Sequence, residues 1–272
     1  MDRVLPDVGT SLGDRLGRNG LLVRALRPAY ARWLRAAYGR RGLPWHINGE
    51  PIRIDPDARH LVPQENERPL FEYLRQHISP GDVVLDIGAF IGTYAILEAR
   101  WAGARGRVLA FEPSPSSFAI LERQARMNGL GPPRFDAYCV AVGARREQRG
   151  LTTFDEEPYR NMIAADGAAA VMVDVVTVDS ACAALDTPPT WIRMDVQGLE
   201  FEVLRGAREL LRERRGRLQI VAEMHPQHWP VYGIDPRDAA ERLAELGLRA
   251  RNVVPDQDPF GYDAHAILEP IE

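Results

Sequence analysis

One segment constrains the fold of this chain more than any other. An apolar strand, residues 83–87, runs directly into a glycine turn, residues 88–92, and a second apolar strand, residues 107–111, ends in Glu112. Glycines let the main chain pass close to a ligand, and an acid after the second strand of such a sheet accepts hydrogen bonds from ribose hydroxyls. The two strand ends therefore predict a site for an adenosyl nucleoside, with S-adenosylmethionine as the expected cofactor.

Strand and helix patterns alternate along most of the remaining chain. After the first two strands, the pattern predicts strands at 135–142, 190–194, 217–223, 248–254 and 263–269, and helices at 66–78, 92–102, 115–128, 198–213 and 236–246. Such alternation requires a mostly parallel sheet with right-handed crossovers and helices on both faces. The last two strands fit an antiparallel hairpin at the sheet edge. Residues 143–190 break the pattern, and we interpret them as an insertion or flap.

The N-terminal part differs from the rest in charge. Residues 1–53 hold ten arginines and four acids, while the whole chain carries a net charge of −4. We expect a helical arm and the start of a hairpin over residues 1–52, with a helix beginning at Pro28, and the main domain over 53–272. The hairpin turns at Asn48 and Gly49. The arm is predicted to pack on its own domain or on a second subunit, and the second case would give a homo-oligomer. The alternative is a surface for a membrane, a partner chain or an anionic substrate.

Composition narrows the class of protein. The chain has 272 residues, of which 45% are hydrophobic and 26% charged, as in soluble globular proteins. No apolar run is long enough to span a bilayer, and no signal peptide is recognised, so a cytoplasmic location is expected. The two cysteines, Cys139 and Cys182, lack the spacing of metal ligands. The negative charge argues against nucleic acid as a partner.

The glycine turn and the second strand supply the predicted cofactor site. The residues expected to bind the cofactor are Asp86, Gly88, Ala89, Phe90, Gly92, Thr93, Tyr94, Glu112 and Pro113. A dinucleotide fingerprint would need glycine at positions 90 and 93, where Phe90 and Thr93 stand, so a nicotinamide oxidoreductase is disfavoured. The sequence holds no Gly-Lys-Ser or Gly-Lys-Thr, which excludes a P-loop.

A second group of polar residues follows the later strands. Asp195 ends one strand, and Glu223 and His225 end the next, so the three side chains could point into one pocket. We predict His225 as the general base, with Asp195 and Glu223 orienting the substrate. The same three residues could instead hold magnesium or manganese. The predicted acceptor-binding residues are Tyr159 and Asn161 in the insertion and His228 and Trp229 after the strand.

Residues 191–207, which read WIRMDVQGLEFEVLRGA, resemble the signature of the FkbM-type methyltransferases. That family usually reads Ile-Lys-Ile-Asp-Val-Glu-Gly-Ala-Glu and then an apolar-acid-apolar-Leu-Arg-Gly run. Residues 86–92 resemble its Asp-Val-Gly-Ala-Asn-Ile-Gly, and residues 176–179 its Thr-Leu-Asp. The resemblance covers residues 65–225 and implies a Rossmann-like class I methyltransferase α/β fold with a mostly parallel seven-stranded sheet and an antiparallel terminal strand. It also implies methyl transfer to oxygen, often in a sugar, glycolipid or polyketide.

Two positions depart from that pattern. Phe90 stands where the family usually has asparagine, and Gln197 where it usually has glutamate. We expect an S-adenosylmethionine-dependent O-methyltransferase that acts on a hydroxyl of a sugar or natural product. The departures leave open a non-catalytic adenosine-binding scaffold of the same fold. A nucleic-acid methyltransferase is disfavoured by the acidic body and the lack of an Asn-Pro-Pro-Tyr motif.

Overall fold

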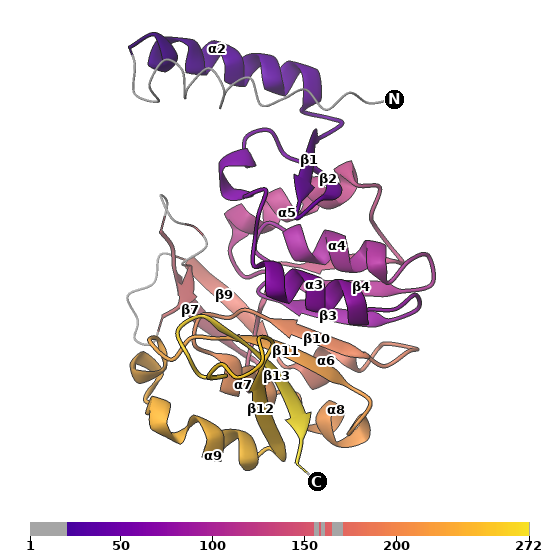
Figure 1. Ribbon diagram of the computed structural model, residues 1–272, viewed down its shortest axis with the longest axis vertical. Coiled ribbons are helices and arrows are strands. Elements are labelled where there is room, and N and C mark those ends of the chain that lie inside the picture. The colour runs from indigo at the N-terminus through magenta and orange to yellow at the C-terminus, as the bar shows by residue number, and fades with distance from the viewer. Residues whose placement is uncertain (1–20, 155–157, 159–160, 165–170, 272) are drawn as a thin grey trace. The chain divides into compact units, whose positions relative to one another are not determined.

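The computed structural model describes residues 21–154, 158, 161–164 and 171–271 (Figure 1). The chain divides into two compact units, residues 1–66 and 67–272. The predicted boundary after residue 52 differs from this division and falls inside the strand Glu50–Ile54. Within the described residues, no helix is both long and apolar enough to cross a membrane.

The first unit contains a long helix and a hairpin. Helix α2 (Leu21–Tyr38) is followed by β1 (Leu43–Ile47), β2 (Glu50–Ile54) and a short 3-10 helix, η1 (Arg59–Leu61). The predicted hairpin is confirmed, with Asn48 and Gly49 both at positive φ in its two-residue turn. Pro28 lies inside α2 and does not begin it, so that prediction is wrong. Residues 1–20, where the arm was expected to start, lie outside the described part.

The second unit is built on a seven-stranded sheet (Figure 1). Its strands, in sheet order, are β12 (Leu248–Asn252), β13 (Ala264–Pro270), β11 (Gln219–Met224), β10 (Trp191–Met194), β3 (Val83–Ile87), β4 (Arg107–Phe111) and β5 (Phe135–Tyr138). Only β13 runs against its neighbours, which confirms a mostly parallel sheet with an antiparallel terminal strand. All five residues of β3 are buried, as a central parallel strand requires.

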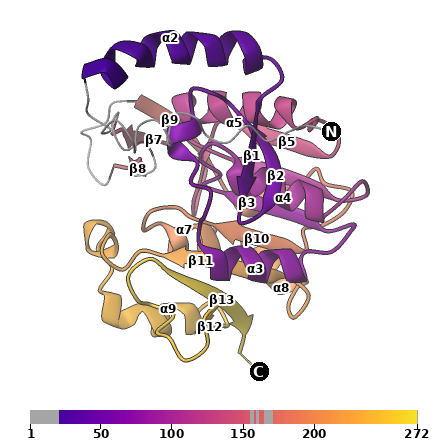
Figure 2. The same ribbon diagram turned by 45° about the horizontal axis from the view of Figure 1, so that its top comes forward.

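Helices cover both faces of this sheet. The helices are α3 (Arg68–His77), α4 (Thr93–Trp101), α5 (Pro115–Met127), α6 (Val178–Cys182), α7 (Glu200–Arg205), α8 (Arg208–Glu213) and α9 (Ala239–Ala244), with 3-10 turns η3 (Trp229–Tyr232) and η4 (Pro236–Asp238). Helices α3, α4 and α5 pack together on one face (Figure 2). Apolar residues of α6 to α9 form one core with the strands. The predicted helix 198–213 is two helices, because Gly206 lets the chain lie against the main chain of Gly143.

A smaller sheet begins just before the predicted insertion, residues 143–190, and has its other three strands within it. Its order is β6 (Ala141–Val142), β9 (Val171–Val176), β7 (Glu147–Thr152) and β8 (Met162–Ile163). Leu151, Ile163 and Val175 belong to a small apolar cluster that also takes in Leu199, the residue before α7. The small sheet is thus anchored beside the loop that follows β10.

Candidate active site

The turn after β3 is tied to the ends of both neighbouring strands. Gly88 has a φ of 81°, and a Cβ there would collide with the carbonyl oxygen of Asp195. The Asp195 amide donates to the carbonyl of Ile87 over 2.9 Å. Phe90 adopts a φ of 51°, and its amide donates to Oε2 of Glu112 over 2.8 Å. Left-handed backbone suits asparagine better than phenylalanine, which fits the asparagine usual at this position in FkbM-type sequences.

Glu112 is the acid that the sequence places beside a ribose. It is 6% exposed and accepts hydrogen bonds from the amides of Phe90 and Ser114, each over 2.8 Å. Burial raises the pKa of its carboxyl to about 7, although those two hydrogen bonds lower it. The carboxylate is therefore fixed in place and retains lone pairs for a ligand.

A pocket opens at the carboxyl ends of β3, β4 and β10, and the small sheet contributes to its wall. The predicted site residues that line it are Gly88, Phe90, Glu112, Pro113, Asn161 and Asp195. Residues of the small sheet, among them Leu151 and Ile163, lie in the same wall, as does Gln197. Residues of the first strand end, the second strand end and the insertion thus meet around one cavity.

Five other predicted cofactor residues, Asp86, Ala89, Gly92, Thr93 and Tyr94, are not among those that line this pocket. Asp86 is fully buried, and its Oδ1 accepts a hydrogen bond from the Arg193 guanidinium over 2.9 Å. The same guanidinium lies 4.5 Å from the ring centre of Tyr94. The backbone of the turn is shaped by three further residues: Ala89, which is buried, Gly92, which packs on Leu121, and Thr93, which begins α4.

The structure brings Asp195, Glu223 and His225 together. Nε2 of His225 lies 3.7 Å from Oδ1 of Asp195 and 3.6 Å from Oε1 of Glu223. Its Nδ1 lies 2.8 Å from Oε1 of Glu200, a residue that the sequence analysis did not place in the site. The amide nitrogen of Gln197 lies 3.0 Å from both Asp195 Oδ1 and His225 Nε2. The cluster is therefore already connected by hydrogen bonds.

These neighbours change the protonation of the cluster. Burial lowers the pKa of His225, but the hydrogen bond to Glu200 and the charges of Glu223 and Asp195 outweigh it and raise that pKa to about 11. Burial and the charge of Glu223 raise the pKa of Asp195 to about 7. Burial alone would raise the pKa of Glu223, but His225 and His265 hold it well below its usual range. Asp195 is thus the member of the cluster that titrates near neutrality.

The predicted acceptor residues are placed differently from one another. Trp229 is 0% exposed and donates through Nε1 to Oε2 of Glu200 over 2.7 Å, so the prediction that its ring faces an acceptor is wrong in this structure. His228 stacks on His225, with ring centres 5.6 Å apart. Asn161 lines the pocket and accepts a hydrogen bond from the Phe154 amide. Tyr159 lies outside the described residues.

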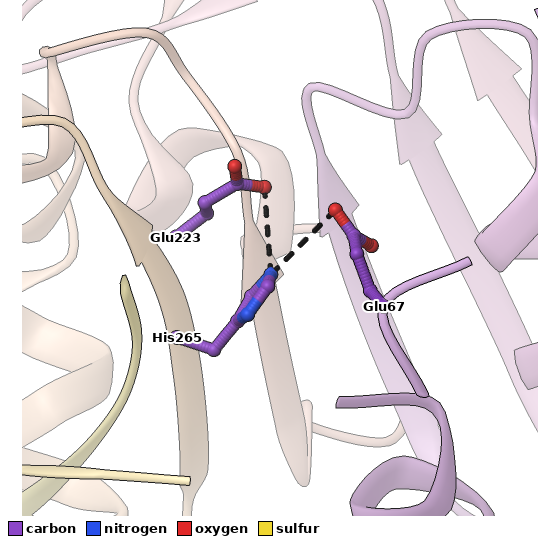
Figure 3. Close-up of side chains that lie close together, drawn as sticks. All are labelled: Glu67, Glu223 and His265. Carbon is purple, nitrogen blue, oxygen red and sulfur yellow. Dashed lines mark ion pairs between the residues drawn. The ribbon is translucent and has the colours of Figure 1, made fainter. Parts of the chain in front are cut away.

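Two residues that sequence reasoning missed lie on the far side of Glu223. His265 stands opposite Glu223 in the β11–β13 register, and its Nε2 lies 3.6 Å from Glu223 Oε2. The same nitrogen lies 3.7 Å from Oε1 of Glu67, which directly precedes α3 (Figure 3). A correct register for the last strand would have found His265, whereas no signal in the sequence points to Glu67.

Two features define a class I methyltransferase fold. Strand β13 is inserted antiparallel between β11 and β12, and a pocket lies at the ends of β3 and β4. The methyltransferase FkbM domain matches residues 86–250, and the chain belongs to this family. The resemblance seen in the sequence is thereby confirmed.

Several solved structures are similar to the chain. Methyltransferase FkbM from Methylobacillus flagellatus is 20% identical with a TM-score of 0.47, and the match covers 70% of this chain and 44% of that one. Aeropyrum pernix fibrillarin with natively bound S-adenosyl-L-methionine is 20% identical with a TM-score of 0.43, and the match covers 70% of this chain and 67% of that one. Cofactor-bound Rv0187 from MTB is 18% identical with a TM-score of 0.46, and the match covers 99% of both chains. The chain thus spans under half the length of the Methylobacillus protein. Among curated proteins, none matches it.

Proposed function

We propose that the protein is an S-adenosylmethionine-dependent O-methyltransferase that acts on a hydroxyl of a sugar or natural product. The observation that carries this proposal is that Glu112 and Asp195 line one pocket at the ends of β4 and β10. We expect Glu112 to accept hydrogen bonds from a ribose and Asp195 to face the reacting end of the cofactor. Membership of the FkbM family supports methyl transfer, and the choice of oxygen and of acceptor follows the family resemblance.

The bound cofactor would supply an activated methyl group. The chain must then hold the acceptor oxygen in line with that methyl, at a distance of about 3 Å, and keep water away. A hydroxyl is a poor nucleophile until a base takes its proton. Asp195 fits this role, because it lines the pocket, its side chain is 25% exposed, and its pKa is raised to about 7.

This proposal gives His225 a different role from the one expected from the sequence. An imidazole whose pKa is raised to about 11 already carries its proton at neutral pH and cannot take another. Its side chain is 2% exposed, and both ring nitrogens face carboxylates. We assign His225 to positioning Asp195 and Glu223 through its positive charge.

The cluster of Asp195, Glu223 and His225 meets some of the requirements of the predicted divalent-metal site. Asp195, Glu223 and His225 each offer one ligand atom, and the three atoms lie within 4.8 Å of one another. Magnesium or manganese held there could polarise the acceptor hydroxyl. However, the Gln197 amide already donates a hydrogen bond to Asp195, and its nitrogen lies 3.0 Å from His225 Nε2. Loss of methyl transfer after EDTA treatment, with recovery on adding either ion, would support this metal; full activity in EDTA would remove it.

We further expect that the acceptor is a small molecule or a saccharide and that nucleic acid is not a partner. We also expect a cytoplasmic location and a homo-oligomer formed through the N-terminal arm. The alternative of a non-catalytic adenosine-binding scaffold rests on Phe90, which lines the pocket, and on Gln197.

The test combines cofactor binding with turnover. Calorimetry with S-adenosylmethionine is expected to show one site per chain, and labelled cofactor should methylate a member of a pool of sugars, glycolipids and polyketides. Asp195→Asn should lower the transfer rate about 100-fold or more while cofactor affinity stays within a few-fold. The exposed Asp186→Asn is the control. Binding without transfer to any acceptor would favour the scaffold, and an unchanged rate in Asp195→Asn would remove its role as base.

A further inference from the structure

We propose that Glu67, Glu223 and His265 bind a divalent transition-metal cation such as Mn²⁺ or Zn²⁺ (Figure 3). The three come from different elements: Glu67 directly precedes α3, Glu223 lies on β11, and His265 lies opposite it on β13. This site shares Glu223 with the Asp195–His225 cluster but uses the other oxygen of that carboxylate.

The distances suit metal ligands better than hydrogen bonds. His265 Nε2 lies 3.6 Å from Glu223 Oε2 and 3.7 Å from Glu67 Oε1. A nitrogen and an oxygen that share a proton lie about 2.7–3.2 Å apart. Ligands around a tetrahedral ion with bonds of about 2.1 Å lie about 3.4 Å from each other. Both nitrogen–oxygen distances are therefore close to the spacing of ligands around an ion, and the three ligand atoms lie within 4.8 Å of one another.

The imidazole nitrogen at the centre of the site is unsatisfied. Nε2 of His265 is buried and makes no hydrogen bond to any residue that the structure describes. A buried polar atom without a partner is rare and calls for an explanation, of which an ion is one. In the neighbouring cluster, by contrast, the Gln197 amide nitrogen lies 3.0 Å from His225 Nε2 and donates to Oδ1 of Asp195. The unsatisfied nitrogen therefore favours the Glu67 side of Glu223 for a cation.

Tyr94 provides a second observation on the same spot. It is 5% exposed, and its hydroxyl makes no hydrogen bond within the described part of the chain. The charges of Glu67 and Glu223 act on the phenol, which therefore lies beside these two carboxylates. The Tyr94 hydroxyl is thus a second buried polar group that a cation, or a water bound to a cation, would satisfy.

The donor set indicates the kind of ion. Carboxylate ligands suit Mg²⁺ and Mn²⁺, whereas an imidazole ligand suits zinc and other transition metals. A site of one histidine and two glutamates therefore favours Mn²⁺ or Zn²⁺ over Ca²⁺. The family match covers residues 86–250 and therefore includes only Glu223 of the three. The site thus depends on the segments that flank the matched part, and it does not rest on the proposed methyl transfer.

The test measures metal binding by the full chain. After chelation and removal of the chelator, the protein is titrated with Mn²⁺, followed by the EPR signal of the free ion, and with Co²⁺, followed by its visible absorption. We expect saturable binding of one ion per chain, with nitrogen ligation in the Co²⁺ spectrum. His265→Ala and Glu67→Gln should each weaken Mn²⁺ binding at least 10-fold, while the exposed His60→Ala should not change it.

Two further measurements keep the proposal falsifiable if a variant folds poorly. Asp195→Asn should leave Mn²⁺ affinity within a few-fold, and Zn²⁺ should shift the imidazole signals of His265 in the NMR spectrum of the unmodified chain. The proposal is overturned if no saturable binding occurs, or if binding survives His265→Ala but is lost in Asp195→Asn. It is also overturned if His265 titrates with a pKa near 9 regardless of Zn²⁺, because a protonated ring then neutralises the carboxylates.

Discussion

Nδ1 of His225 lies 2.8 Å from Oε1 of Glu200, and both side chains are buried. Glu200 also accepts hydrogen bonds from the Gly198 amide and from Trp229 Nε1, so one carboxylate holds the loop after β10, the end of β11 and η3 together. Asp195 lines the pocket, and the cluster around it is therefore supported by Glu200, which does not line the pocket.

Replacing Glu200 by alanine should strongly destabilise the fold, because it leaves a buried imidazolium and a buried indole N–H without an acceptor. We expect a loss of about 3–5 kcal/mol in the free energy of unfolding, measured with urea. Glu200→Gln keeps one acceptor and should lose about 1–2 kcal/mol. Glu213→Ala, at an exposed position, should stay within about 0.5 kcal/mol. A loss below about 1 kcal/mol in Glu200→Ala would contradict the supporting role.

Glu112→Gln should weaken cofactor binding without unfolding the protein. Its carboxylate is expected to accept hydrogen bonds from the ribose, and a hydrogen bond to a charged group is worth about 1.5–3 kcal/mol, or about 10- to 100-fold in affinity. Calorimetry with S-adenosylhomocysteine gives the dissociation constants. Glu122→Gln, on the half-exposed surface of α5, is the matched control. Equal affinity in wild type and Glu112→Gln would mean that the ribose lies elsewhere.

Cofactor affinity should also depend on pH through Glu112. Its pKa in the folded protein is raised to about 7, so lowering the pH below that value protonates the carboxyl and removes an acceptor for the ribose. The dissociation constant should therefore rise as the pH falls from 8 to about 5.5, and Glu112→Gln should flatten the profile. Calorimetry across this range provides the check, and a wild-type profile as flat as that of the variant would refute the assignment.

Glu98 should make the fold less stable as the pH rises. The residue is fully buried, and neither carboxyl oxygen makes a hydrogen bond to the residues described. Burial, and then the charge of Asp86, raise its pKa well above the usual 4.5. The folded state therefore keeps a proton that the unfolded state releases. Stability from this group is full below pH 4.5 and falls by up to about 1.4 kcal/mol per pH unit as the pH approaches the folded pKa.

Glu98→Gln removes that titration while keeping the shape of the side chain. The free energy of unfolding of the variant, relative to wild type, should therefore increase between pH 5.5 and 8.5 in urea titrations. The half-exposed Glu72→Gln should show no such trend. A difference between Glu98→Gln and wild type that stays constant with pH would show that Glu98 is ionised in the folded protein.

The sequence could predict the parts of the site that depend on strand ends. Apolar runs and turn residues mark where β3, β4, β10 and β11 end, and parallel neighbours bring those ends to one edge. Glu112 and Asp195 were found in this way and line the pocket. The same reasoning failed for Trp229, because an aromatic residue in a loop can either face solvent or fill the core, and only packing decides between them.

Local sequence pattern alone thus determined the order of strands and helices and the glycine turn with its following acid, because these depend on residues close in the chain. It also determined that Asp195, Glu223 and His225 meet, because the geometry of parallel strands brings their ends together. Tertiary structure alone decided that Glu200 holds His225 and that His265 and Glu67 flank Glu223. It also decided that the carboxyls of Asp195 and Glu112 titrate near neutrality. Those relations depend on strand register, burial and the distances between charges, which residues far apart in the chain acquire only on folding.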